Sequence, residues 1–179
     1  MGGLSPRRDR ALLLLGFAGA FRRSGLVALD VADLEFCDSG LRVTIHKSKT
    51  DQEGLGTTIA IARGSVASPV DAVRAWVKAA AIVGGPLFRP VTRKEKVSAR
   101  RLSARAVAEL VKSYARRAGP KAADFCGHSL RSGFLTSAAA HGASIFKMVD
   151  VSRHKSVDTL RGYIRDAEIF RNHAGRGLL

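Results

Sequence analysis

The sequence predicts an α+β fold that is mainly helical, with helices around a small antiparallel sheet of three strands. Helix-start signals recur along the chain, each a serine followed by a proline or by a polar first turn. One intervening stretch, residues 34–63, instead shows the alternation of apolar and polar residues that is typical of half-buried strands. The chain has 179 residues, of which 46% are hydrophobic, so we expect one domain with a packed core over residues 1–179.

The N-terminal part is expected to form two helices. The first begins at Ser5, with Ser5 as N-cap and Pro6 at the first helical position. From Ala11 onward this helix is apolar on nearly all sides, which predicts that it is buried in the core. A short second helix follows, with Ser24 as its expected N-cap.

The sheet follows these two helices. Leu41, Val43 and Ile45 alternate with polar residues, which predicts a strand with one buried face. A hairpin connection follows this strand, with Lys47 and Lys49 at its mouth. The three strands are expected at residues 34–36, 41–48 and 57–63.

The rest of the chain is expected to be helical. Ser68-Pro69, Ser103 and Ser144 are helix-start signals, and Ser156 with Asp158 is another. Gly119-Pro120 and Gly142 are typical helix stops. The helices are expected at residues 70–82, 104–118, 129–140 and 144–149, with a last helix that carries Tyr163.

The net charge of +15 indicates a polyanionic partner, most simply nucleic acid. The alternative is a solvated basic surface, as in a ribosomal-type protein. The segment 89–101 is too polar to fold alone and is expected to be an exposed loop that faces DNA, or a loop that is only solvated. The candidate DNA-binding residues there are Arg93, Lys94, Lys96, Arg100 and Arg101.

Cysteine usage and hydropathy point to a cytoplasmic protein. Cys37 and Cys126 match no metal-ligand spacing, so we expect free thiols in a reducing compartment and no metal site. The apolar run 11–20 is shorter than the roughly 20 residues that span a bilayer. Arg22 and Arg23 follow this run directly, so it does not read as a signal peptide.

Four polar residues stand out between positions 128 and 163. His128 and Arg131 are three apart and share one helix face, near a helix N-terminus that suits an anion. His154 follows Arg131 after 23 residues, and Tyr163 comes nine residues after His154. Tyrosine can act as a nucleophile when cations or a base assist it, although a mid-helix tyrosine is usually a packing residue. Together these residues predict half of a site that acts on a phosphate ester.

Arg22 and a hairpin lysine supply the upstream half, and the order of all six positions resembles the catalytic domain of the tyrosine recombinases, the phage-integrase family. The segment 20–26 (AFRRSGL) matches the motif of the first arginine, Arg22. Ser48-Lys49-Thr50 matches the hairpin lysine, which favours Lys49 over Lys47. His128-Ser129-Leu130-Arg131 matches the central motif, followed by His154 and Tyr163. The resemblance extends from about Pro6 to Asp166.

The sequence departs from the family pattern at two positions. Gly25 replaces an acidic residue that supports the first arginine in the family. The alternatives are that its loss loosens Arg22 or that another acid, such as Asp30 or Asp33, substitutes for it. Arg153 replaces a common glycine before His154, which adds charge without removing a catalytic group. The family's N-terminal core-binding domain is also absent. We therefore expect a fragment, an engineered piece or the product of a truncated gene.

The resemblance implies that Tyr163 attacks DNA to form a 3′-phosphotyrosine, without metal or cofactor. Arg22 and Arg131 would neutralise the phosphate, and His154 would donate a hydrogen bond. His128 would act as acid or base near the tyrosine, and Lys49 would protonate the leaving oxygen. The implied function is site-specific DNA recombination. The alternatives are relaxation of DNA by a type IB topoisomerase-like enzyme and a catalytically weakened DNA-binding protein.

The resemblance also implies the partners. These are a double-stranded DNA recombination site and further copies of the chain, as a dimer to tetramer on DNA. The tail 164–179 is a candidate for packing in trans, with Ile169 and Phe170 as an apolar plug. The alternative is a tail that folds back on its own domain. The expected location is the cytoplasm of a bacterium, with a bacterial or phage gene as the source.

Overall fold

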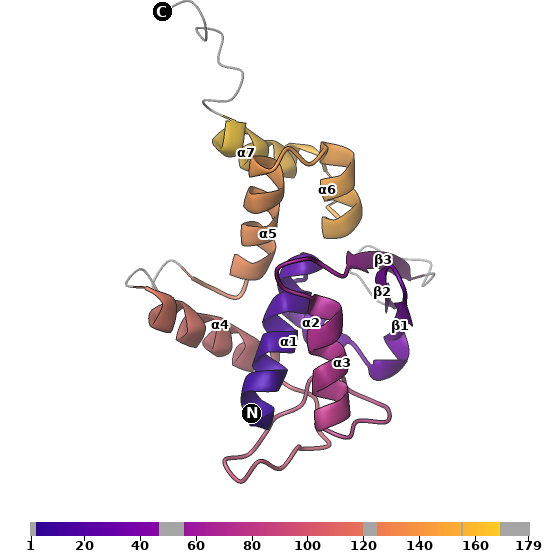
Figure 1. The fold of residues 1–179 in the computed structure, drawn as a ribbon. Coiled ribbons are helices and arrows are strands. Elements are labelled where there is room, and N and C mark those ends of the chain that lie inside the picture. Colours follow the sequence, from indigo (N-terminus) through magenta and orange to yellow (C-terminus); the bar gives the residue numbers. More distant parts are fainter. Residues whose placement is uncertain (1–2, 47–55, 120–124, 155, 169–179) are drawn as a thin grey trace, which may run out of the picture.

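The computed structural model describes residues 3–46, 56–119, 125–154 and 156–168, and only the backbone of residues 165–168. These residues form seven α-helices and one three-stranded sheet, so the predicted α+β class is confirmed (Figure 1). None of the seven described helices has the length and apolar character needed to cross a membrane.

Helix α1 (Leu4–Ala18) lies in the main core, as predicted. Its buried positions include Leu12 and Leu15, and it packs against α3 (Pro69–Ala79) and α5 (Ser129–Ala140). The predicted start at Ser5 is wrong, because the helix begins at Leu4 and Gly3 is the N-cap. The backbone amide of Leu4 donates to the Glu95 carboxylate, a partner 91 residues away that no local pattern reveals.

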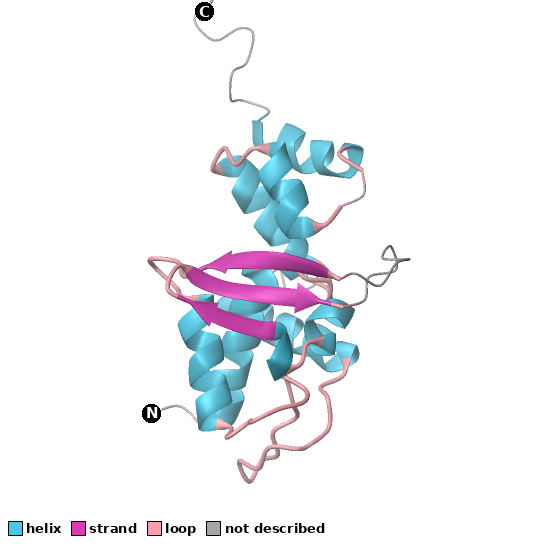
Figure 2. Ribbon diagram, turned by 90° about the vertical axis from the view of Figure 1, so that its right-hand side faces the viewer, coloured by secondary structure: helices cyan, strands magenta, loops and turns pink. Residues whose placement is uncertain are grey.

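The sheet consists of β1 (Leu34–Cys37), β2 (Gly40–Ile45) and β3 (Thr57–Ala62), in the antiparallel order β1-β2-β3. Figure 2 shows the sheet covering one side of the helices. Leu41 pairs with Ile61 and Val43 with Ile59, and all four are buried. The alternation in the sequence therefore predicted the buried face correctly.

Helix α4 (Ala104–Ala118) has the predicted bounds, whereas α3 begins at Pro69, directly after the predicted start signal Ser68, and ends at Ala79, three residues before the predicted end. The Ser68 hydroxyl accepts the backbone amide of Asp71 at 3.0 Å, and the Ser103 hydroxyl accepts that of Ala106 at 3.1 Å. On α3 the fully buried Trp76 donates through Nε1 to the Leu87 carbonyl at 2.8 Å. This bond fastens the chain after α3 to the core.

Helices α5, α6 (Ile145–Ser152) and α7 (Asp158–Glu168) surround a second, smaller apolar cluster (Figure 1). Its buried members are Leu135, Ala139, Met148 and Leu160. Helix α6 extends three residues past the predicted end at Val149. Its last residue, Ser152, is fully buried. The turn between α1 and α2 (Arg23–Ala28) faces this second cluster.

Candidate active site

The turn between α1 and α2 presents Arg22. Ala20 has a left-handed backbone with φ 46°, and Phe21 is buried beneath the turn. The predicted N-cap Ser24 is wrong, because Arg22 is the N-cap of α2 and its side chain makes no capping bond. The backbone of Arg22 is extended there, and its side chain is exposed at a helix N-terminus, an environment that favours anions.

Arg131 lies one turn into α5 and is 5% exposed. Its Nη1 donates to the carbonyl oxygen of Ala20 at 2.8 Å, which joins the second cluster to the turn that carries Arg22. Its Nη2 is buried and has no hydrogen-bond partner among the described residues. A buried donor without a partner is costly, so this nitrogen is available for a ligand oxygen.

Arg153 approaches the same turn from α6. It ends α6 with a left-handed backbone, at φ 56° and ψ 42°. Its Nη2 donates to the carbonyl oxygens of Gly19 at 3.3 Å and Ala20 at 3.5 Å, and its guanidinium carbon lies 4.8 Å from the centre of the Phe21 ring. Its Nη1 is also buried without a partner in the described part of the chain.

The cations in this site affect one another strongly. Burial, and then the charges of Arg22 and Arg153, lower the pKa of Arg131 to about 10. Burial and Arg22 lower the pKa of Arg153 to about 10 as well, so both arginines stay charged at neutral pH. Burial, followed by the charges of Arg131, Arg22 and Arg153, lowers the pKa of His154 to about 4. His154 is therefore a neutral imidazole at pH 7.

A buried hydroxyl orients His154. Ser152 is fully buried, and its Oγ lies 2.8 Å from His154 Nδ1. A neutral imidazole whose Nδ1 accepts this hydroxyl carries its proton on Nε2. The arrangement can thus present an N–H donor to the space that the arginines surround.

Tyr163 packs against the second cluster and lies within electrostatic reach of Arg131. It is half-buried on α7, and its ring lies against the second cluster. A negative charge on Tyr163 would stabilise the charged form of Arg131, which places the phenol within electrostatic reach of that guanidinium. The sequence left packing and chemistry as alternatives for Tyr163, and this position is compatible with both.

The structure thus brings together Arg22, Arg131, His154 and Tyr163, although these residues lie up to 141 positions apart in the sequence. His128 is the exposed N-cap of α5, three residues before the buried Arg131. That the two side chains share one helix face stays a prediction. Lys49 lies outside the described residues. The sequence pattern assigns Arg153 only added charge and no place in the site. Its place before His154 was the available signal.

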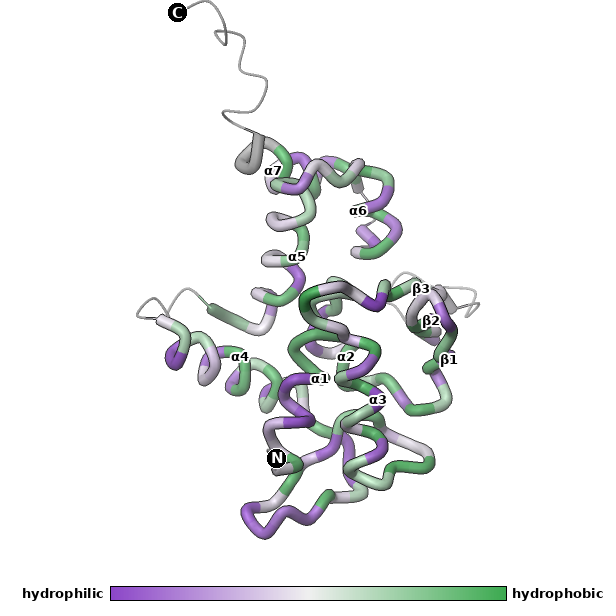
Figure 3. The backbone as a smooth tube through the Cα atoms, viewed as in Figure 1, coloured by the Kyte–Doolittle hydropathy of each residue, from purple (hydrophilic) through white to green (hydrophobic). Residues whose placement is uncertain are grey.

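The predicted basic loop lies far from these residues. Arg93, Lys94, Lys96 and Arg100 are exposed, and the loop between α3 and α4 occupies the end of the molecule opposite α6 and α7 (Figure 1). Figure 3 shows the outer turn of this loop as hydrophilic.

Arg101, the last residue of the basic loop, has intramolecular partners. Its Nη1 donates to the carbonyls of Val27 at 2.7 Å and Leu29 at 3.0 Å, and its Nη2 contacts the Asp30 carboxylate at 2.5 Å. The side chain therefore ties the loop to the end of α2. Its role in binding DNA stays a prediction.

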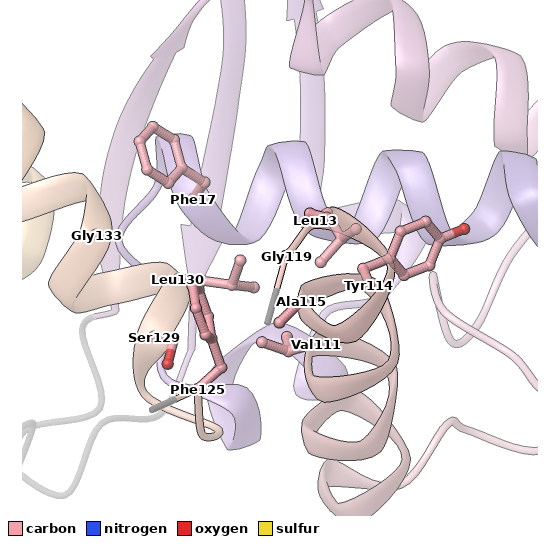
Figure 4. Close-up of a pocket in the computed structure, with 11 residues that line it drawn as sticks. Leu13, Phe17, Val111, Tyr114, Ala115, Gly119, Phe125, Ser129, Leu130 and Gly133 are labelled. Atoms are coloured by element: carbon pink, nitrogen blue, oxygen red, sulfur yellow. The ribbon is translucent and has the colours of Figure 1, made fainter. Parts of the chain in front are cut away.

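An apolar hollow of about 700 Å³ lies between α1, α4 and α5 (Figure 4). Phe17 and Phe125 at this hollow are 38% and 42% exposed, which is unusual for large apolar side chains. Leu13, Val111 and Leu130 also line it. The hollow is separate from the arginine cluster.

The fold is that of the catalytic domain of a tyrosine recombinase. The chain belongs to the phage integrase family, whose model matches residues 4–168. It is 43% identical over 173 residues to an integrase/recombinase XerD homolog of Selenomonas ruminantium, in a match that covers 96% of this chain and 51% of the relative. It is 33% identical over 166 residues to the tyrosine recombinase XerD of Xanthomonas axonopodis pv. citri, covering 87% of this chain and 50% of the relative. The chain spans about half the length of these curated relatives.

Solved structures of recombinases share the fold. The XerH site-specific recombinase bound to its palindromic difH substrate in a post-cleavage complex aligns with a TM-score of 0.73 at 15% identity, over 94% of this chain and 45% of XerH. The XerA recombinase aligns with a TM-score of 0.70 at 17% identity, over 94% of this chain and 58% of XerA. The predicted tyrosine-recombinase catalytic-domain fold is therefore confirmed.

Proposed function

We propose that this chain cleaves and rejoins DNA strands as the catalytic domain of a site-specific recombinase. The observation that carries the proposal is the buried Arg131 and the half-buried Arg153, each with one buried nitrogen that is unpaired among the described residues, beside a tyrosine and a neutral histidine. No carboxylate among the described residues forms an ion pair with Arg22, Arg131 or Arg153. An anionic phosphate would supply the missing counter-charge.

The proposed reaction begins when the Tyr163 oxygen attacks the scissile phosphorus in line. A bond forms between Tyr163 Oη and phosphorus, the bond from phosphorus to the 5′-oxygen breaks, and the products are a 3′-phosphotyrosine and a 5′-hydroxyl. Arg22 and Arg131 offset the charge that develops on the non-bridging oxygens, and His154 Nε2–H donates to one of them. The phosphoester energy is kept in the protein–DNA bond, so a 5′-hydroxyl from another strand can reverse the step.

Proton transfer in this proposal involves His128 and Lys49. The phenol must lose a proton as it attacks, and His128 is assigned as the base or acid that serves it. The leaving 5′-oxygen must gain a proton, and Lys49, on the connection between β2 and β3, is assigned as its donor. The reaction needs neither a metal ion nor a cofactor.

Double-stranded DNA is the proposed substrate, and further copies of the chain, as a dimer to tetramer, are the proposed partners. The net charge of +15 supports binding to a polyanion. Arg93, Lys94, Lys96, Arg100 and Arg101 remain proposed DNA contacts. The named relatives are recombinases and integrases, which favours recombination over topoisomerase-like relaxation. They also come from bacteria, which supports a cytoplasmic protein encoded by a bacterium or its phage.

The apolar hollow is the proposed contact between copies on DNA. It is lined almost entirely by apolar side chains, including the exposed Phe17 and Phe125. Residues 169 and 170 of the C-terminal tail are an Ile-Phe pair, which has matching chemistry and follows the helix that carries Tyr163. We assign the tail of a neighbouring copy as the occupant of the hollow.

A covalent-capture experiment tests the catalytic proposal. The protein is incubated with a pool of nicked DNA duplexes of random sequence, in which the fragment released after cleavage diffuses away and the adduct accumulates. Adducts are isolated on a denaturing gel, and their DNA is sequenced. The expected result is an adduct enriched in one sequence with the wild-type protein and no adduct with Tyr163→Phe. Failure of the wild-type protein to form any adduct would overturn the proposed function, and an adduct with Tyr163→Phe would overturn the choice of nucleophile.

A further inference from the structure

Arg131 and Arg153 both donate to the carbonyl oxygen of Ala20. Arg131 donates to Ala20 O from α5 through Nη1, and Arg153 reaches Ala20 O and Gly19 O from the end of α6 through Nη2. In each guanidinium the other terminal nitrogen is buried and unpaired within the described residues: Nη2 of Arg131 and Nη1 of Arg153. The two side chains thus share a carbonyl acceptor and each have one buried, unpaired nitrogen, although Arg131 is buried, Arg153 is half-buried and only Arg131 belongs to the predicted motif.

We propose that Arg153 is a third arginine of the phosphate-binding site, contacting the scissile phosphate through Nη1. This proposal rests on the proposed function, because it deepens the account of the same site. Arg153 then supplies positive charge to the reacting phosphate in addition to that of Arg22 and Arg131.

Electrostatics favours a ligand role for Arg153. Its guanidinium and that of Arg22 repel each other, and both act on His154. A buried arginine usually has a carboxylate partner, and none of the described ion pairs includes Arg153. The Phe21 ring, 4.8 Å away, offsets only part of this cost. An oxyanion bound between the arginines removes the repulsion and satisfies both unpaired nitrogens.

The backbone at Arg153 also indicates that its side chain has a function. Its φ of 56° is a conformation that glycine adopts without strain and that arginine adopts only at a cost. The hydrogen bonds from Arg153 to the turn 19–22 do not explain this cost well. Their lengths of 3.3 Å and 3.5 Å exceed the 2.8 Å bond that Arg131 already makes to the same turn.

The first experiment measures cleavage and binding separately. With the DNA sequence recovered from the covalent-capture selection, the single-turnover rate of adduct formation is measured at saturating protein, and the Kd is measured on the intact duplex. Arg153→Gly is expected to lower the cleavage rate by about a hundredfold, as for loss of one transition-state contact, with the Kd changed by less than about threefold. Arg153→Lys is expected to recover part of the rate because it keeps the charge.

Two controls exclude a folding defect. Glycine suits the left-handed backbone, so Arg153→Gly is expected to keep the Tm of the wild type. Arg74→Ala is the matched variant, because Arg74 also stacks on a phenyl ring, 4.9 Å from the centre of Phe36, but lies on α3. It is expected to change the cleavage rate by less than about twofold.

A substrate with an uncharged phosphate analogue distinguishes two roles of Arg153, which are binding the phosphate and holding the turn 19–22 in place. When a methylphosphonate replaces the scissile phosphate, one charged oxygen is lost, and a cation that neutralises it is needed less. The defect of Arg153→Gly is therefore expected to shrink at least about tenfold relative to the wild-type protein on the same substrate. An equal defect on both substrates, or wild-type cleavage by Arg153→Gly, would overturn the inference and leave the proposed function standing. Absence of any adduct with the wild-type protein would instead overturn the proposed function.

Discussion

Burial and the combined field of three arginines determine the protonation of His154. Its pKa is lowered to about 4 by burial and by the charges of Arg131, Arg22 and Arg153, while Ser152 holds its Nδ1. A neutral ring is suited to donating one hydrogen bond to a phosphate without adding a fourth positive charge to the site. Bound phosphate would reverse the field and raise the pKa of His154.

We expect Arg22→Ala to raise the pKa of His154, because removing a nearby positive charge makes the imidazolium less unfavourable. The measurement is an NMR titration of the His154 ring in the free protein. Arg23→Ala is the matched control, since Arg23 lies against Gly127 and acts on Cys126 rather than on His154. Equal shifts in the two variants would contradict the assignment of Arg22 to the site.

The lowered pKa of His154 also predicts how stability depends on pH. Between about pH 6.5 and pH 4 the unfolded chain binds a proton at this histidine that the folded chain does not. The contribution of His154 to the free energy of unfolding is therefore present above pH 6.5 and is lost as the pH falls toward 4. Urea unfolding of the wild type and of His154→Gln across this window measures it. We expect the histidine-dependent slope to disappear in the variant.

Gly25 leaves room for the acidic side chain that the family pattern has there. A Cβ at this position would have Phe21 Cδ1 as its nearest neighbour, at 3.8 Å, an ordinary contact. Gly25→Ala and Gly25→Glu are both expected to raise the free energy of unfolding by about 0.5–1 kcal/mol, because glycine is unfavourable inside a helix. Thermal unfolding measures this effect, and a further gain for Gly25→Glu alone reports an ion pair with Arg22. A decrease in both variants would contradict the space seen around Gly25.

At the scale of elements, helix ends are fixed by two kinds of partner. The N-termini of α3 and α4 are capped by serines, each of which accepts the backbone amide of the residue three positions further on. A sequence pattern can identify such a cap. The start of α1 is instead bound by Glu95, and the end of α2 by Arg101, which is more than 70 residues away. The loop between α3 and α4 therefore stabilises both N-terminal helices.

Arg101→Ala is expected to lower the free energy of unfolding by about 1–3 kcal/mol, because it leaves the Val27 and Leu29 carbonyls without this donor. Arg100→Ala, the neighbouring exposed arginine, is expected to change it by less than about 0.5 kcal/mol. Chemical denaturation of both variants makes the comparison. If both lose DNA binding and neither loses stability, the intramolecular role of Arg101 is wrong.

At the scale of the whole molecule, the candidate site lies where two apolar clusters meet. The main cluster holds α1 to α4 and the sheet, and the smaller one holds α5 to α7 (Figure 1). Arg131 and Arg153 extend from the smaller cluster to the turn 19–22 of the larger one. The geometry of the site therefore depends on how the two clusters pack.

The apolar hollow gives a prediction about assembly. Phe125→Asp places a charge among apolar side chains, so a neighbouring copy is expected to bind there more weakly. On DNA with two half-sites, sedimentation analysis should show one bound copy where the wild type gives two. Val83→Asp, at a fully exposed position, is the control and should assemble normally. Normal assembly of Phe125→Asp would contradict the proposed role of the hollow.

The sequence by itself determined the fold class and most helix starts, and it predicted the residues of the candidate site. These follow from capping partners three residues apart, from alternation along single strands, and from the order of motifs along the chain. Only the tertiary structure decided that Arg22 acts on His154, that Arg131 is buried while His128 is exposed, and that Arg153 turns toward Ala20. Each of these depends on contacts between residues more than 100 positions apart, and the path of the chain that creates such contacts is not encoded in any local pattern.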